Sequence, residues 1–350
     1  MYRVDEFRKL FDKSAVFDSP DNMFYLTGFR GEGCVLVTPR AAVIITDSRY
    51  TEQAERQSPE CKVETTGKER GREAIIREYL SAEGINELHV ETGVLTVRAY
   101  RAMEEKLPGV KLSDMPNITG GMREVKSAQE LDCISKAVKI SGRAFEALLE
   151  KLKPGMTEKQ ARAVLEYEMY ACGADGLAFD TIVASGVNGS LPHAVPSDKV
   201  INKGELVTFD FGAKYGGYCS DCTRTVAVGN VSDELKRIYD AVYNAHMAAL
   251  SEVKPGAVTK ELDGIARRYL DGLYPGAFGH SLGHGVGIFI HETPTVNYRD
   301  ANVLRPGHVI TIEPGVYIKG VGGCRIEDTV FVTETGFTDP YTISKQLIVV

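Results

Sequence analysis

Short apolar runs alternate with amphipathic, helix-like stretches over the first third of the chain. Residues 33–38 (GCVLVT) and 41–46 (AAVIIT) predict two strands that are joined by a proline-containing turn. Residues 68–81 and 96–106 have the charged and apolar spacing of helices, and residues 87–91 between them predict another strand. Strands that alternate with helices indicate an α/β layer in this part of the chain.

A new series of helices begins shortly after two consecutive glycines at positions 120 and 121. Ser127 and Glu130 have the spacing of a capping box, in which the hydroxyl and the carboxylate each accept a hydrogen bond from a backbone N–H at the helix start. This helix is expected to run to about residue 153, where Pro-Gly follows, and Thr157 with Gln160 predicts the start of a second helix.

These signals divide the chain into two domains, residues 1–125 and 126–350. Within the second domain, residues 147–155 (ALLEKLKPG) resemble residues 248–256 (AALSEVKPG), at an offset of 101 positions. The resemblance predicts two related α+β units, with a site between them where side chains from both converge. The alternative is that the helix–Pro-Gly–helix arrangement recurs by chance.

Composition and charge exclude several classes of protein. The chain has 350 residues, 43% of them hydrophobic, with 41 Lys and Arg against 48 Asp and Glu for a net charge of −7. These values are typical of a globular protein of about two domains and argue against a general affinity for nucleic acid or anionic membranes. No apolar window approaches the ~18 residues of a membrane span, no secretory signal is recognised, and the seven cysteines are an odd number. We expect a cytoplasmic protein with reduced thiols.

Two acidic residues interrupt apolar, strand-like runs between residues 206 and 226 (LVTFDFGAKYGGYCSDCTRTV). Asp210 lies between two phenylalanines, and Asp221 follows eleven residues later in the predicted returning strand of a hairpin. A carboxylate in such a strand is costly to bury without a cation or several hydrogen-bond donors. Two carboxylates side by side repel one another unless a metal ion lies between them. The alternative for either acid alone is a strand position that faces solvent.

The same pattern occurs twice near the C-terminus. Glu313 follows the apolar run 309–312, and Glu327 lies just before the apolar run 329–332. Four separate acids in strand-like apolar segments are difficult to explain as solvated faces, whereas a metal centre accounts for all four.

His284 lies in Gly-His-Gly-Val-Gly, where glycines allow a close approach to an ion. Four carboxylates and one imidazole favour Mn²⁺, Co²⁺ or Fe²⁺, with Zn²⁺ as an alternative. Several carboxylates allow bridging of two ions about 3.5–4 Å apart, and such a pair would lower the pKa of a shared water. The predicted chemistry is metal-assisted hydrolysis.

Three further histidines are candidates for a role beside this centre. His280 and His291 flank His284 in the sequence, and His193 lies in Leu-Pro-His-Ala-Val-Pro. Each alone could be a structural histidine, but beside metal-activated water they would suit proton transfer or stabilisation of an anionic intermediate. The pair Cys219 and Cys222 has C-x-x-C spacing but no second pair to complete a zinc site.

The five predicted ligands, in their order and local context, resemble those of the creatinase/aminopeptidase ("pita-bread") family of metallopeptidases, and within it the Xaa-Pro branch of prolidases and aminopeptidases P. The resemblance covers nearly the whole chain, and its motifs lie at residues 25–29, 46–50, 181–186, 313–317 and 325–328. It implies an α+β protein in which a pita-bread catalytic domain (126–350) with an internal pseudo-repeat follows a smaller creatinase-like α/β N-terminal domain (1–125).

The resemblance also implies a role for each ligand. Asp210 would bind one metal ion through both oxygens, and Asp221 and Glu327 would bridge two ions. His284 and Glu313 would complete the second ion's coordination, and Glu313 would also handle the proton of a bridging hydroxide. The implied cofactor is two divalent ions, Mn or Co in preference to Zn or Fe.

For the substrate, the resemblance implies a proline-containing peptide that is hydrolysed at the Xaa-Pro bond. His193 and His291 match the family's catalytic, substrate-facing histidines. His280, Tyr317 and Arg325 match residues around the pocket for the proline ring, and Arg325 is also expected to pair with Asp210. A homodimer is expected from the family alone.

Two positions depart from the pattern of a prolidase of this size. Thr295 stands where such an enzyme often has an arginine that holds the carboxylate of a dipeptide, and Phe289 stands where an acid is frequent. Both dipeptidase and aminopeptidase specificity therefore remain open. The alternatives are a methionine-type or broader aminopeptidase, which usually lacks the N-terminal domain, and a non-enzymatic peptide-binding protein, which would be expected to have lost ligands.

Overall fold

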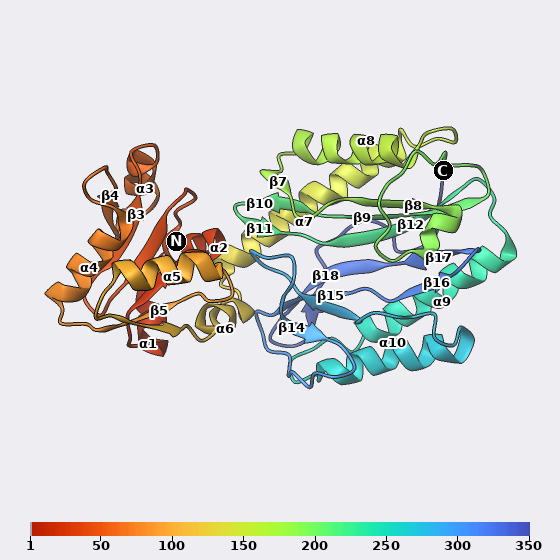
Figure 1. The fold of residues 1–350 in the computed structure, drawn as a ribbon. Helices are drawn as coiled ribbons and strands as arrows, with labels where there is room; N and C mark the ends of the chain where they lie inside the picture. Colours follow the sequence, from red (N-terminus) through yellow and green to blue (C-terminus); the bar gives the residue numbers. More distant parts are fainter. Residues whose placement is uncertain (1) are drawn as a thin grey trace. The chain divides into compact units, whose positions relative to one another are not determined.

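The computed structural model describes residues 2–350, which form two compact units (Figure 1). The first unit ends at Met122 and the second begins at Arg123.

The first unit is an α/β layer built on a six-stranded mixed sheet. Its strands are β1 (Ala15–Phe17), β2 (Cys34–Val37), β3 (Ala42–Thr46), β4 (Lys62–Thr65), β5 (Glu87–Val90) and β6 (Lys111–Asp114), in the order β4-β3-β2-β1-β5-β6. Its helices are α1 (Val4–Leu10), α2 (Pro20–Thr27), α3 (Thr51–Gln57), α4 (Arg72–Ala82), α5 (Val97–Lys106) and α6 (Ile118–Glu124), the last of which runs into the second unit. The pairs β1–β5, β5–β6 and β3–β4 are parallel, and the pairs β1–β2 and β2–β3 are antiparallel.

The predicted strands and helices of this unit are present within a few residues of their expected ends. Thr96 caps α5 because its hydroxyl accepts a hydrogen bond from the Ala99 backbone N–H at 3.2 Å. The central strand β1 was not predicted, because three apolar residues between polar neighbours are too short a pattern to distinguish a strand from a loop.

The second unit contains a long, mostly antiparallel sheet with two pairs of helices. The helices are α7 (Ala128–Leu149), α8 (Glu158–Ala171), α9 (Asp233–Leu250) and α10 (Thr259–Leu273), with a short 3-10 helix η1 (Gly186–Ser190). The nine-stranded sheet consists of β8 (Ile182–Ser185), β9 (Glu205–Phe211), β12 (Cys222–Val228), β13 (Gly283–Gly285), β14 (Glu292–Val296), β15 (Val309–Ile312), β18 (Glu327–Val332), β19 (Phe337–Thr338) and β20 (Ile348–Val349). The smaller sheets consist of β7 (Gly176–Leu177), β10 (Ala213–Tyr215) and β11 (Tyr218–Cys219), and of β16 (Gly315–Ile318) and β17 (Gly322–Arg325).

The helix starts follow the predicted capping signals. Ser127 and Glu130 form a capping box at α7, and Thr157 and Gln160 form one at α8. Helix α7 ends at Leu149, four residues before the expected end, and a turn leads into the Pro-Gly segment.

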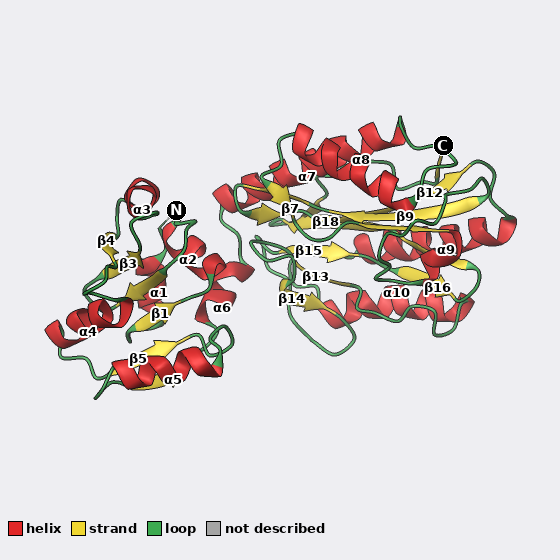
Figure 2. Cartoon of the chain, turned by 45° about the horizontal axis from the view of Figure 1, so that its top comes forward, coloured by secondary structure: helices red, strands yellow, loops and turns green. Residues whose placement is uncertain are grey.

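The two halves of the second unit repeat one another, as the sequence predicted. At equivalent points before α8 and α10, the Gly155 N–H donates to Ile201 O at 3.0 Å and the Gly256 N–H donates to Leu304 O at 2.9 Å. Figure 2 shows α7 and α8 beside the part of the long sheet that holds β9, and α9 and α10 beside the part that holds β15 and β14. The order β14-β13-β15-β18-β12-β9-β8 brings strands from both halves together at β18 and β12.

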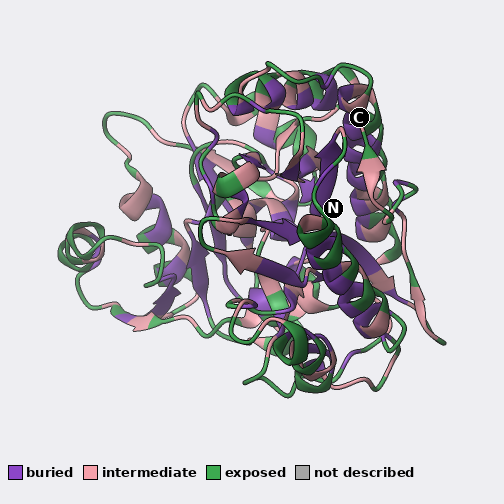
Figure 3. Cartoon of the chain, turned by 90° about the vertical axis from the view of Figure 1, so that its right-hand side faces the viewer, coloured by how far each residue is buried: buried purple, intermediate pink, exposed green. Residues whose placement is uncertain are grey.

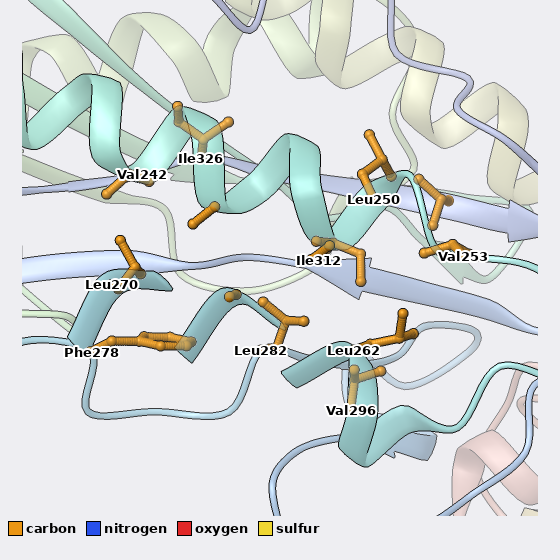
Figure 4. Close-up of a cluster of buried hydrophobic side chains, with 14 of the residues drawn as sticks. Val242, Leu250, Val253, Leu262, Leu270, Phe278, Leu282, Val296, Ile312 and Ile326 are labelled. Atoms are coloured by element: carbon orange, nitrogen blue, oxygen red, sulfur yellow. The ribbon is translucent and has the colours of Figure 1, made fainter. Parts of the chain in front are cut away.

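The apolar core of the second half lies between α9, α10 and the strands. In Figure 4, Val242 and Leu250 from α9, Leu262 and Leu270 from α10 and Ile312 of β15 belong to one cluster of buried side chains between the helices and the strands. All five side chains are buried, and the burial view in Figure 3 shows the strands mostly buried, with exposed residues along the helices. This cluster includes Ile312 and Ile326, which directly precede Glu313 and Glu327, so the packing fixes the backbone next to these two acids.

No helix within residues 2–350 has both the length and the continuous apolar character that a membrane span requires.

Candidate metal centre

Three carboxylates meet where β9, β12 and β18 lie side by side. Asp210 of β9 is paired in register with Thr223 of β12, and Thr223 is paired in turn with Glu327, the first residue of β18. Asp221 directly precedes β12 and is not within it. The register therefore brings together acids that are more than 100 residues apart in the sequence.

His284 and Glu313 come from two neighbouring strands. His284 lies in β13, and Glu313 directly follows β15, with which β13 pairs. The strands are close because residue 283 is glycine, whose added Cβ would lie 2.0 Å from Thr311 O. The Nε2 atom of His284 lies 3.4 Å from Asp221 Oδ2 and 3.4 Å from Glu313 Oε1.

The cluster concentrates negative charge in a buried position. Burial and the neighbouring carboxylate charges raise the pKa of Asp221 to about 6 and of Glu313 to about 7, and they raise the pKa of Glu327 well above its usual value. Burial alone would lower the pKa of His284, but the hydrogen bond to Asp221 and the charge of Glu313 raise it to about 9. Without a cation, the acids can relieve their repulsion only by binding protons.

Asp210 is held on one side by an arginine. Nη2 of Arg325 donates to Asp210 Oδ2 at 2.6 Å, so the predicted pairing is present. The other oxygen, Asp210 Oδ1, is buried and has no hydrogen-bond partner among residues 2–350. An unpaired buried carboxylate oxygen costs free energy unless something else binds it.

These residues fit a divalent metal ion. One donor atom each from Asp221, His284 and Glu327 lie within 4.8 Å of one another, and Asp210 Oδ1 supplies an unused anionic oxygen. Carboxylates with one imidazole are the donor set of hard and borderline divalent ions.

The cluster lies at a cavity of about 520 Å³, which four of the five other predicted site residues also line. His193, His280, His291 and Arg325 face this cavity. The rings of His291 and His284 meet edge to face, with their centroids 4.4 Å apart. Burial and the charges of His284 and His193 lower the pKa of His291, which favours a neutral imidazole.

Tyr317 joins the predicted substrate-binding residues to one another. Its hydroxyl lies 2.9 Å from His280 Nε2 and accepts a hydrogen bond from Arg325 Nη1 at 2.7 Å. Burial and the charge of Arg325 lower the pKa of His280 to about 4, and burial raises the pKa of Tyr317 to about 12. His280 and Tyr317 are therefore uncharged at neutral pH.

Two threonines that the sequence did not single out contact the predicted ligands. The Thr223 hydroxyl donates to Glu327 Oε2 at 2.6 Å and accepts from Arg325 Nε at 3.0 Å. The Thr311 hydroxyl donates to Glu313 Oε1 at 3.3 Å and accepts from the His284 backbone N–H at 3.1 Å. Each threonine lies two residues in sequence from a predicted ligand at a strand end, Thr223 after Asp221 and Thr311 before Glu313, and this spacing was the signal that could have identified it.

His246, which the sequence left without a role, lies directly behind the centre. It is fully buried on α9, and its Nε2 lies 3.0 Å from Oδ2 of Asp328, the residue after Glu327. Cys219 and Cys222 are both buried, and burial raises the pKa of the Cys222 thiol well above the usual value.

Comparison with known proteins places both units in described families. Residues 132–334 match metallopeptidase family M24, and residues 4–125 match the creatinase/prolidase N-terminal domain.

Relatives of similar length are known from several organisms. An Xaa-Pro dipeptidase of Pyrococcus horikoshii is 39% identical over 318 residues, covering 90% of this chain and 88% of the relative. The structure is similar to that of an Xaa-Pro dipeptidase from Bacillus anthracis, with a TM-score of 0.95 and 37% identity, and 99% of each chain is covered. It is also similar to an X-Pro aminopeptidase from Thermotoga maritima, with a TM-score of 0.93 and 34% identity, covering 99% of this chain and all of that one.

The order of the acids and the histidine, their convergence on one cavity, and the match of both units lead to one conclusion. This chain belongs to metallopeptidase family M24, as a pita-bread peptidase preceded by a creatinase/prolidase N-terminal domain.

Proposed function

We propose that this peptidase hydrolyses the bond between an amino-terminal residue and proline, with two divalent metal ions, manganese or cobalt, as cofactors. The observation that carries the proposal is the position of the carboxylate cluster at the same cavity as His193, His291 and the group formed by His280, Tyr317 and Arg325. The relatives named as Xaa-Pro dipeptidases and as an X-Pro aminopeptidase support this substrate class. We also propose that residues 126–350 carry the chemistry and that residues 1–125 form a separate domain.

The proposed metal ligands are the five residues predicted from the sequence: Asp210, Asp221, His284, Glu313 and Glu327. When bound, divalent ions would lower the pKa of a water molecule and polarise the carbonyl of the peptide bond. Asp221 and Glu327 are the proposed ligands shared by both ions, and in support of this one donor atom of each lies within 4.8 Å of the other and of a ring nitrogen of His284.

The chain's own groups would stabilise the reacting carbonyl and move protons. His291 and His193 line the cavity beside His284, and the pKa of His291 is lowered, so that its neutral ring offers one N–H donor. Such a donor can stabilise the oxygen on which negative charge develops. Glu313, whose pKa is raised to about 7 by burial without an ion, is placed to accept and return a proton.

An Xaa-Pro bond has no N–H, so its recognition depends on the shape of the ring and on flanking contacts. His280 and Arg325 line the cavity and are fixed by the Tyr317 hydroxyl between them. Arg325 is also fixed by Asp210, Thr223 and Pro192 O, which uses its donors within the protein. We propose that this rigid wall contacts the proline ring.

The cavity offers little to hold the carboxylate of a dipeptide. Within residues 2–350, the lining contains one Lys or Arg side chain, Arg325, and its guanidinium is already bound by protein oxygens. Thr295 also lines the cavity, and its hydroxyl donates to the Asp300 carboxylate. These contacts favour peptides longer than a dipeptide and are the reason to test both substrate lengths.

The decisive experiment compares Ala-Pro with Ala-Pro-Ala after reconstitution with Mn²⁺, Co²⁺ or Zn²⁺. A higher kcat/KM for the tripeptide indicates an aminopeptidase of the Xaa-Pro type, and a higher value for the dipeptide indicates a prolidase. Methionyl peptides without proline serve as the control. Preferential cleavage of those peptides would contradict the proposal and would support a methionine-type or broader aminopeptidase. Homodimer formation stays a prediction, which light scattering of the metal-loaded protein would check.

A further inference from the structure

A buried carboxylate with an unusual number of donors lies at the first turn of α8. Glu158 is 0% exposed. Its Oε1 accepts hydrogen bonds from the Ser185 N–H and hydroxyl, both at 2.8 Å, and its Oε2 accepts from the Ser197 N–H at 3.0 Å and from the Ser197 hydroxyl at 2.7 Å. Nδ2 of Asn188 lies 3.1 Å and 3.2 Å from the two oxygens. All these donors come from residues 185–197, a connecting loop that starts at the last residue of β8 and includes η1.

That loop carries one of the histidines of the cavity. Ser185 is the last residue of β8, and Ser197 lies twelve residues later, so Glu158 joins the two ends of the segment between them. The segment contains Pro192 and His193, both of which line the cavity. His193 itself is exposed, so its position depends on how the loop backbone is held.

The middle of the loop is fixed by direct backbone contact with β17. An added Cβ at Gly323 would lie 2.1 Å from Gly189 O, so only glycine allows this approach. Arg325, at the end of β17, donates through Nη1 to Pro192 O at 3.2 Å. Glu158 therefore completes a set of contacts that fix the loop at both ends and next to His193.

Glu158 is stabilised by hydrogen bonds alone. In residues 2–350 no salt bridge involves it; the nearby Lys199 donates to the Ser185 hydroxyl and to Glu205 instead. Burial would raise the pKa of Glu158, but the hydrogen bonds from Ser197 and Ser185 outweigh burial and lower it, so the carboxylate is charged at neutral pH. Glutamine has the same shape but would direct an NH₂ group at N–H donors, and it therefore cannot replace these contacts.

The second half of the repeat shows that the fold does not require a carboxylate at the position of Glu158. The equivalent residue of α10, 101 positions later, is Thr259, which donates a single hydrogen bond to Asp300 O at 2.8 Å. A carboxylate with five donor groups is therefore specific to the half that carries His193.

We infer that Glu158 is a positioning residue that holds His193 at the cavity by tying together the ends of loop 185–197. The inference rests on the proposed function in so far as His193 contacts the substrate. Misplacement of a reacting group by about 1 Å can cost about 100-fold in rate. Loss of the carboxylate should therefore affect turnover without affecting the metal ligands.

The test is a double-mutant cycle with metal-loaded enzyme, using Glu158→Gln and His193→Ala. We expect Glu158→Gln to lower kcat on Ala-Pro-Ala or Ala-Pro by about 10- to 100-fold, with a smaller change in KM and unchanged metal content. In the His193→Ala background the same substitution should cost less than about twofold, because the two residues act through one another. Equal losses in both backgrounds would overturn the inference while leaving the proposed function intact.

A second measurement does not depend on activity. Amide hydrogen exchange in the metal-free protein should be at least about tenfold faster in residues 186–197 of Glu158→Gln, with β9 and β12 unchanged. Ser197→Ala, which removes one of the donors, gives a weaker version of the same change if Glu158→Gln does not fold. Unchanged exchange in this loop would contradict the inference.

The matched control is Glu91→Gln in the first unit. Glu91 is also a buried carboxylate, and it accepts hydrogen bonds from the backbone N–H groups of Asp18 and Ser19. Its substitution should change exchange near Asp18 but not in loop 185–197, and it should leave kcat and KM unchanged. If the wild-type enzyme cleaves no Xaa-Pro peptide, the proposed function fails, and the exchange measurement still decides whether Glu158 holds the loop.

Discussion

Single hydroxyl and guanidinium contacts set the direction of the carboxylates around the cavity. Thr223 binds Glu327, Thr311 binds Glu313, and Arg325 binds Asp210, each through one oxygen of the carboxylate. These contacts leave the remaining oxygens available and do not remove the repulsion between the acids. A cation is the simplest group that would both bind the remaining carboxylate oxygens and compensate the repulsion between the acids.

Asp221→Ala should abolish metal-dependent hydrolysis. Asp221 lies within reach of both His284 and Glu327, so its removal takes away an oxygen shared by the whole donor set. We expect less than about 1% of wild-type turnover and reduced metal per chain, measured by peptide hydrolysis and atomic absorption. Near-normal turnover would contradict the proposal of two ions.

His291→Ala should separate metal binding from turnover. The ring of His291 packs against His284 but is absent from the group of atoms that could hold an ion. We expect the variant to keep its metal and to lose about 10²- to 10⁴-fold in kcat, the range for loss of a proton-transfer group. A fall in metal content would show instead that His291 is a ligand.

His308 should make stability depend on pH. Burial and the charges of Arg305 and Lys126 lower its pKa from 6.5 to about 4. Between these values the unfolded chain binds more protons than the folded chain, so the stability contributed by neutral His308 is complete above pH 6.5 and decreases as the pH falls toward 4.

We compare the free energy of unfolding of the wild type with that of His308→Gln. The difference between the two proteins should be about 2 kcal/mol less favourable to the wild type at pH 5 than at pH 7.5. Urea denaturation at the two pH values measures this difference. An advantage that does not change with pH would mean that the pKa of His308 is not lowered.

At the scale of elements, β12 and β18 are joined by a buried ion pair next to the proposed ligands. Nη2 of Arg224 donates to Asp328 Oδ1 at 2.5 Å, and both side chains are at most 1% exposed. Arg224 also donates to Glu327 O, so it fixes the backbone of a proposed ligand. His246 from α9 and Lys345 from the C-terminal segment bind the other oxygen of Asp328. Four separate segments thereby meet behind the cavity.

Arg224→Met should destabilise the second unit strongly. The substitution removes the cation at Asp328 Oδ1, and loss of one partner of a buried ion pair typically costs about 3–5 kcal/mol. The control is Lys236→Met on α9, which breaks an exposed pair with Asp233 and should cost less than about 1 kcal/mol. Urea denaturation of both variants gives the comparison, and similar losses would argue against a central role for this pair.

At the scale of the whole molecule, all five proposed ligands belong to one of the two compact units. Each of them lies between residues 210 and 327, within the unit that begins at Arg123. Metal binding is therefore expected to act on the stability of that unit.

Removal of the metal should lower the stability of residues 123–350 selectively. A ligand at 100 times its Kd stabilises the folded state by about 2.7 kcal/mol. We expect Mn²⁺ to slow amide exchange in β9, β12, β15 and β18 relative to protein treated with EDTA, and to leave β1–β6 unchanged. Equal protection of both units would contradict this expectation.

Much of the local structure was predictable because its causes lie within a few residues. The capping boxes at Ser127 and Thr157 and the strands at residues 34–37 and 42–46 follow from short patterns. The short strand β1 and the partners of His246 were not predictable, because each depends on contacts with distant segments.

The sequence by itself identified the acids and His284 as candidate ligands, because a charged residue inside an apolar run is anomalous wherever the strand lies. Only the tertiary structure decided which atoms meet. Thr223 and Glu327 are separated by 104 residues, and their contact depends on the register between β12 and β18. The same is true of Glu158, which is an ordinary helix-start residue in sequence. Its contacts with a loop 27 to 39 residues later exist only in the folded chain.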